Sequence, residues 1–63
     1  MHETLESDSL GKIELKKENV SEVFVYDAKT YEKIPFRTED SVKGVLVVGK
    51  PYQDVEVDYN FNY

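Results

Sequence analysis

The sequence predicts a small all-β protein of about five short antiparallel strands, arranged as a meander, as a small sandwich or as a partly open barrel of the SH3-like or OB-like type. Three observations predict this class. Several short segments alternate apolar and polar residues, turn-forming residues separate these segments, and no segment shows a sustained helical period. A chain of 63 residues is enough for one domain with a thin core, since so short a chain buries only about 60% of its unfolded surface.

The beginning of the chain is expected to contribute little to this core. Residues 1–11 contain only Leu5 and Leu10 as apolar side chains after the initiator Met, among acidic and hydroxyl residues. This composition predicts a flexible acidic tail. The single β domain is then expected to occupy residues 12–63.

The first half of that domain contains two predicted strands and a hairpin connection. Residues 12–16 alternate apolar and charged side chains, which is typical of a half-buried strand. Residues 23–26 are four consecutive β-branched or aromatic residues, which predicts a strand buried on both faces. The connection that follows Asp27 resembles a hairpin turn in which Tyr31 takes the position where glycine would supply a positive φ.

The second half contains three further predicted strands. Pro35 cannot donate a hydrogen bond to a neighbouring strand, so the strand around Ile34 and Phe36 should lie at an edge or end early. Residues 45–48 form the most apolar stretch and are predicted to be the central strand. Residues 54–63 are predicted to return beside that stretch as a long hairpin partner at the edge of the sheet.

Composition argues against several classes of function. The 13 acidic residues exceed the 8 basic ones by enough to give a net charge of −5, which disfavours a nucleic-acid partner and favours a basic protein. Cysteine is absent, and the single histidine, His2, lies in the predicted tail. We therefore expect no enzyme, no cofactor and no metal site.

The sequence also predicts no membrane association. The longest apolar run, residues 45–48, is far shorter than a membrane span, and the N-terminus has neither the basic region nor the apolar stretch of a signal peptide. A cytoplasmic protein is therefore expected. Synthesis in a bacterial cell, encoded by the cell or by a phage, fits this expectation equally well.

The stretch from residue 54 to residue 63 places acidic and amide residues on one face of the predicted strand and apolar residues on the other. Asp54, Glu56 and Asp58 project about 6.8 Å apart, which is too wide for one Ca²⁺ to be held by all three. Their charges are also sparser than those of a nucleic-acid backbone, so mimicry of DNA is a weaker explanation than a polar face that meets water because the other face is buried. If the face has a function, its charges would select a basic partner.

The apolar face of this stretch ends in Tyr59, Phe61 and Tyr63, and the last two are predicted to run past the neighbouring strand. The predicted partner-binding residues are Asp54, Glu56, Asp58, Tyr59, Phe61 and Tyr63. They predict a protein-interaction module that acts through its C-terminal edge strand, as an assembly subunit or as an inhibitor of a basic protein, with a homodimer through the same strand as one form. The alternative is a small-barrel nucleic-acid-binding protein that uses exposed aromatic residues.

Overall fold

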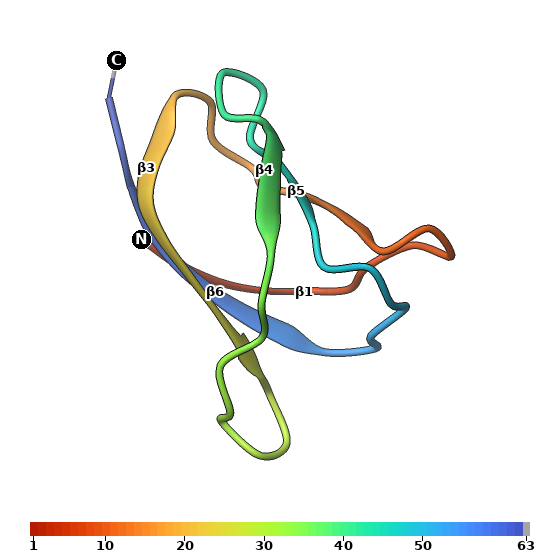
Figure 1. Cartoon of the computed structure of the whole chain (residues 1–63). Helices are drawn as coiled ribbons and strands as arrows, with labels where there is room; N and C mark the ends of the chain where they lie inside the picture. Colours follow the sequence, from red (N-terminus) through yellow and green to blue (C-terminus); the bar gives the residue numbers. More distant parts are fainter. Residues whose placement is uncertain (63) are drawn as a thin grey trace.

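The computed structural model describes residues 1–62, which form six short strands and no helix. The strands are β1 (His2–Leu5), β2 (Lys12–Glu14), β3 (Val20–Asp27), β4 (Arg37–Asp40), β5 (Val45–Val47) and β6 (Val55–Phe61). They form two antiparallel sheets, with the strand order β1-β6-β3 in sheet A and β2-β5-β4 in sheet B (Figure 1). The all-β prediction is confirmed, but the structure has six strands where about five were expected, and its two sheets stay open rather than closing into a barrel.

One hydrophobic core joins the two sheets. Side chains alternate between the two faces of a strand, so each sheet directs one face inward and the other toward solvent. The buried apolar residues are Ile13, Leu15, Val20, Val25, Ile34, Leu46, Val55, Val57 and Tyr59. Both sheets contribute to this set, and the central strand of each sheet supplies residues that are fully buried.

Strand β6 shows the predicted division into two faces. Val55, Val57 and Tyr59 are at most 1% exposed, whereas Asp58 and Asn60 between and beyond them are exposed. The interpretation of the first three apolar positions as core is therefore confirmed. The polar positions of the strand remain on the solvent side of sheet A.

The structure corrects the prediction of a flexible N-terminal tail. Strand β1 pairs with β6 over four residues, from His2 opposite Asp58 to Leu5 opposite Val55 (Figure 1). The sequence obscures this strand because the more buried of its two inward positions is Glu3, and only the other, Leu5, is apolar. The Tyr59 hydroxyl donates a hydrogen bond to the Glu3 carboxylate, and the Lys16 backbone N–H donates a second one of 3.3 Å.

The connection between β1 and β2 is also ordered by hydrogen bonds. The hydroxyl of buried Ser7 donates to the Lys50 carbonyl at 2.7 Å and accepts from the Tyr52 N–H at 2.5 Å. The Asp8 carboxylate accepts from the backbone N–H groups of Leu10 and Lys12, both at 2.9 Å. The hydrogen bond from Lys12 contributes most to lowering the pKa of Asp8 below its ordinary value.

The predicted hairpin between residues 45–48 and the C-terminal stretch is wrong. Strand β5 is central, as expected, but in sheet B, where its neighbours are β2 and β4. Strand β6 lies in sheet A between β1 and β3 (Figure 1). The connection from residue 48 to residue 54 crosses from one sheet to the other, so β6 is a central strand and not the predicted edge strand.

The turn after β3 follows the sequence prediction closely. Tyr31 has a φ of 59°, the positive value expected at a position that favours glycine. Its N–H donates to the Asp27 carbonyl at 2.7 Å, and a single bridge pairs Tyr26 with Lys33. After Pro35 the chain leaves sheet A and continues as β4, an edge strand of sheet B. The strand predicted around Ile34 and Phe36 is reduced to the single bridge at Lys33, and β4 begins only at Arg37.

The hydrogen bond between Tyr59 and Glu3 generates a stability prediction. Tyr59→Phe is expected to lower the free energy of unfolding by about 1–3 kcal/mol, because it removes the side-chain donor from a buried carboxylate. Combining it with Glu3→Gln should give an effect that differs from the sum of the single effects by about 0.5 kcal/mol or more. Urea denaturation measures all three variants, with Tyr31→Phe at an exposed tyrosine as the control. If the effect of the double variant equals the sum of the two single effects, Tyr59 and Glu3 are not energetically coupled.

The same pair predicts a loss of stability at high pH. Burial, followed by the hydrogen bond to Glu3 and its negative charge, raises the pKa of the Tyr59 hydroxyl above its ordinary value of 10.0. The contribution of the neutral Tyr59 hydroxyl to the free energy of unfolding is fully present below pH 10.0. It declines as the pH rises toward the folded-state pKa, because Tyr59 ionises at a lower pH in the unfolded chain than in the folded one. Thermal melts between pH 8 and pH 11.5 should therefore fall more steeply for the wild type than for Tyr59→Phe.

Candidate functional site

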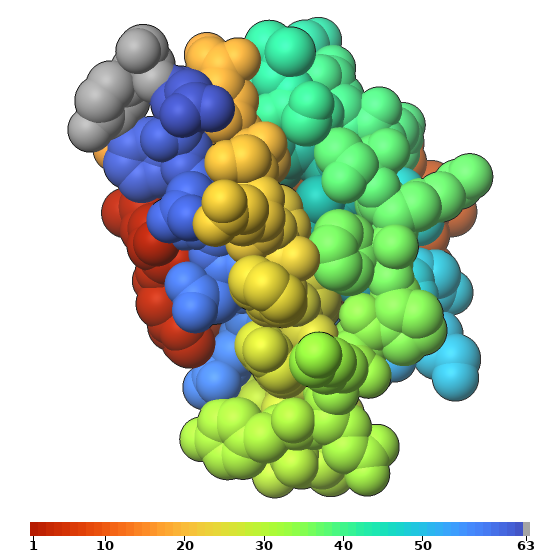
Figure 2. All heavy atoms as spheres, turned by 60° about the vertical axis from the view of Figure 1, so that its left-hand side comes forward, coloured from red at the N-terminus to blue at the C-terminus, as the bar shows by residue number. Residues whose placement is uncertain are grey.

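The solvent side of sheet A carries a set of side chains that we call the acidic face. Asp58 of β6 lies opposite His2 of β1 and Phe24 of β3 in the pairing register. Directly paired residues place their side chains on the same side of a sheet. The acidic face is formed by His2, Thr4, Glu22, Phe24, Tyr26, Glu56, Asp58 and Asn60. Figure 2 shows the three strands of this sheet side by side as red, blue and yellow bands.

The acidic face is negatively charged because the strands of sheet A contain no lysine or arginine. It carries the carboxylates of Glu22, Glu56 and Asp58. The N-terminal ammonium group lies at its margin, 3.9 Å from the Asp58 carboxylate. A solvent-exposed ion pair of this kind is largely screened by water, so the face retains most of its negative field.

The side chain of Phe24 lies among these carboxylates on the acidic face. Phe24 is 49% exposed, although the sequence predicted that residues 23–26 would be buried on both faces. Val25, the next residue, is only 2% exposed. The prediction failed because sheet B covers only one side of sheet A, and Phe24 lies on the other side, opposite Asp58.

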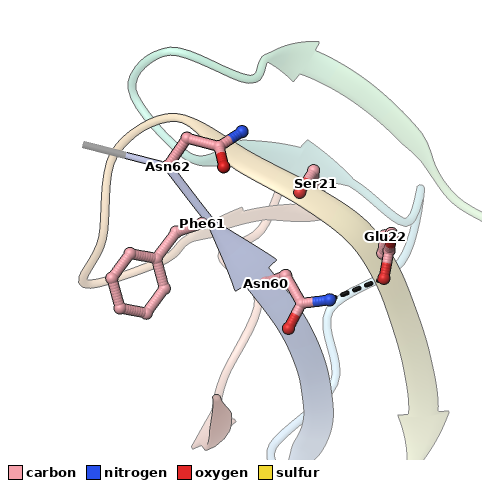
Figure 3. Close-up of a pocket in the computed structure, with 5 residues that line it drawn as sticks. All are labelled: Ser21, Glu22, Asn60, Phe61 and Asn62. Atoms are coloured by element: carbon pink, nitrogen blue, oxygen red, sulfur yellow. Dashed lines mark hydrogen bonds between the residues drawn. The ribbon is translucent and has the colours of Figure 1, made fainter.

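A β-bulge brings Glu22 to the same face. The register between β3 and β6 shifts between Ser21 and Phe24, and Glu22 there has a φ of 51°, which is uncommon for a residue with a side chain. Bulges of this kind redirect a side chain. The Glu22 carboxylate accepts a hydrogen bond of 2.5 Å from the side-chain amide of Asn60 (Figure 3).

The structure distributes the predicted partner-binding residues over three locations. Glu56 and Asp58 lie on the acidic face, whereas Asp54 is exposed in the connection before β6 and lines a separate hollow with Asp27 and Lys29. Tyr59 is 1% exposed and belongs to the core. The expected row of three carboxylates along one strand is therefore reduced to two, and Glu22 supplies the third from a neighbouring strand.

Phe61 also differs from its prediction. Its backbone is paired with Val20 of β3, so it does not run past the neighbouring strand. Its partly buried ring lies 6.4 Å from that of Tyr59, and the Lys17 ammonium is 5.1 Å from its centre. Tyr63, the last predicted site residue, lies outside the described residues.

Sequence reasoning missed Phe24 and did not assign Glu22 to the site. The alternation of Phe24 and Tyr26 with Val25 was the available signal for a solvent-facing Phe24, but the continuous apolar run concealed it. No comparable signal marks Glu22, because a bulge has no fixed sequence pattern outside its glycine-containing forms.

The described part of the chain offers neither a metal centre nor a membrane span. Residues 1–62 bring no three histidine, aspartate or glutamate side chains into an arrangement that could hold a metal ion. They also contain no helix with the length and apolarity needed to cross a bilayer.

Comparisons with known proteins gave no match: no family model, no curated protein and no solved structure corresponds to this chain. Its function is therefore inferred from its own surface.

The exposure of Phe24 predicts that this residue contributes little to folding. Phe24→Thr should change the free energy of unfolding by less than about 1 kcal/mol, because half of the ring is already in water and threonine suits a strand. Leu46→Ala, at a fully buried position of the core, should cost about 2–5 kcal/mol. Urea denaturation measures both variants. An equal loss in the two would show that Phe24 is required for packing.

Proposed function

We propose that this protein is a small protein-interaction module that binds a basic protein through its acidic face. One observation carries the proposal: a half-exposed phenylalanine stands among Glu22, Glu56 and Asp58 on strands that contain no lysine or arginine. Aromatic residues are enriched in protein interfaces, and complementary charge speeds association and selects the partner. A polyanion such as DNA would meet repulsion on the same surface.

The proposed mechanism uses a sheet face rather than a sheet edge. Strand β6 has a neighbour on each side, so a partner cannot add a strand along the paired length of β6 without displacing β1 or β3. The partner would instead cover Phe24 and place lysine or arginine side chains near the carboxylates. Binding to a basic groove of an enzyme would make the protein an inhibitor, and binding to a basic subunit would make it an assembly component. We propose that either role is carried out in the cytoplasm.

A peptide-display selection on the immobilised protein tests this function. The enriched peptides should combine lysine or arginine with an apolar residue, and their affinity should fall by about tenfold or more between 50 and 500 mM salt, because salt screens exposed charges. Glu56→Gln combined with Asp58→Asn should abolish the enrichment, and Phe24→Ala should weaken it.

Charge-matched controls separate a local site from a general effect of net charge. Glu14→Gln combined with Glu18→Gln neutralises two exposed acids outside sheet A and should leave the selected peptides bound. Equal losses in the two double variants would contradict a site on the acidic face. A band-shift titration in which the protein binds DNA at low salt would favour the nucleic-acid alternative instead.

A further inference from the structure

One end of the acidic face is hollowed at the bulge of β3. The hollow has a volume of about 540 Å³ and is open to solvent. It is lined by Ser21, Glu22, Asn60, Phe61 and Asn62. In Figure 3 the phenyl ring of Phe61 points away from the other labelled side chains, so Phe61 borders the hollow mainly through its backbone. The remaining lining side chains carry oxygen atoms that accept hydrogen bonds.

The hydrogen-bond pattern orients one of these acceptors. The side-chain NH₂ of Asn60 donates to one carboxylate oxygen of Glu22, and this bond holds the carboxylate beside the hollow (Figure 3). Within residues 1–62 no hydrogen bond or ion pair occupies the second oxygen of that carboxylate, and a carboxylate can accept from several donors. Asn62 and Ser21 flank the same space with an amide and a hydroxyl group, whose oxygen atoms can each accept a hydrogen bond. The hollow is therefore rich in acceptors and negatively charged.

This combination fits a guanidinium group better than other common ligands. Arginine presents five N–H donors in a rigid plane, which can contact a carboxylate and neighbouring amide oxygens together, whereas lysine presents one compact ammonium group. A sugar would use the same polar groups but commonly also rests on an aromatic ring. The Phe61 ring is turned to the opposite side of β6, so the hollow lacks such a platform (Figure 3).

We infer that the hollow at the β3 bulge is a binding site for an arginine side chain of the basic partner. This inference rests on the proposed function and sharpens it, because it names the residue type that the partner must place at one end of the acidic face. Phe24 follows the bulge along β3. It would then contact the aliphatic part of the partner's arginine side chain, or an apolar residue next to that arginine in the partner. The strained backbone conformation of Glu22, with its positive φ, directs the carboxylate toward the hollow where the arginine would bind.

The test uses the full ¹⁵N-labelled chain and three blocked hexapeptides that differ only at one central position, which is arginine, lysine or citrulline. Outside that central position, all three peptides carry the same lysine and the same phenylalanine, so that each can bind the acidic face. The arginine peptide should shift the backbone signals of Ser21 and Glu22 and the side-chain NH₂ signals of Asn60 and Asn62. It should bind about tenfold more tightly than the lysine or citrulline peptide, because only arginine offers the charged planar fork.

Two variants assign the effect to the hollow. Glu22→Gln keeps the shape of the side chain and its bond to Asn60 while removing the charge, and it should reduce the affinity of the arginine peptide about tenfold but leave that of the citrulline peptide nearly unchanged. Asn62→Ala should remove part of the arginine preference. Glu14→Gln, an exposed acid on β2, is the matched control and should have no effect.

The outcomes separate this inference from the proposed function. If the peptides bind and Asp58→Asn weakens them, but arginine is not preferred or Glu22→Gln has no effect, the arginine site is wrong and the acidic face remains the interface. If no peptide perturbs any signal of the acidic face at millimolar concentration, both are wrong. A saccharide that shifts the same signals when the arginine peptide does not would overturn the ligand class.

Discussion

The pairing of β6 on both of its sides is the constraint on which the rest of the structure depends. Its register with β1 and with β3 brings residues from the beginning, the middle and the end of the chain into one sheet. Its inward side chains then form the part of the core that meets sheet B. With no disulfide available, backbone pairing of this strand and apolar burial beneath it are what connect the two ends of the chain.

The surface that we propose as functional follows from the same constraint. A strand with alternating residues can bury only one face, so the acidic and amide residues of β6 reach solvent together. The neighbouring strands add Phe24 and Glu22 to them, the first through regular register and the second through a bulge. In the bulge, Glu22 has an uncommon backbone conformation, and its side chain accepts a hydrogen bond from Asn60. A local irregularity thereby becomes part of the proposed recognition surface.

Sequence reasoning succeeded where the deciding interactions are local. The positive φ of Tyr31, the early end of pairing before Pro35 and the core positions of β6 all depend on nearby residues or on simple alternation. It failed at β1, because a buried carboxylate with a tyrosine donor from the far end of the chain does not resemble a core position. It also failed for Phe24, because a continuous apolar run does not indicate which side of its own sheet the second sheet will cover.

The sequence by itself determined the all-β class, the division of β6 into two faces and the net negative charge on which the proposal of a basic partner rests. Only the tertiary structure decided which strands are neighbours, and therefore that β6 is central and that Glu22, Phe24 and Asp58 share one surface. The physical reason is that alternation specifies which side chains of a strand point the same way. The choice of neighbouring strand depends on pairing between residues far apart in the chain, which no local pattern encodes.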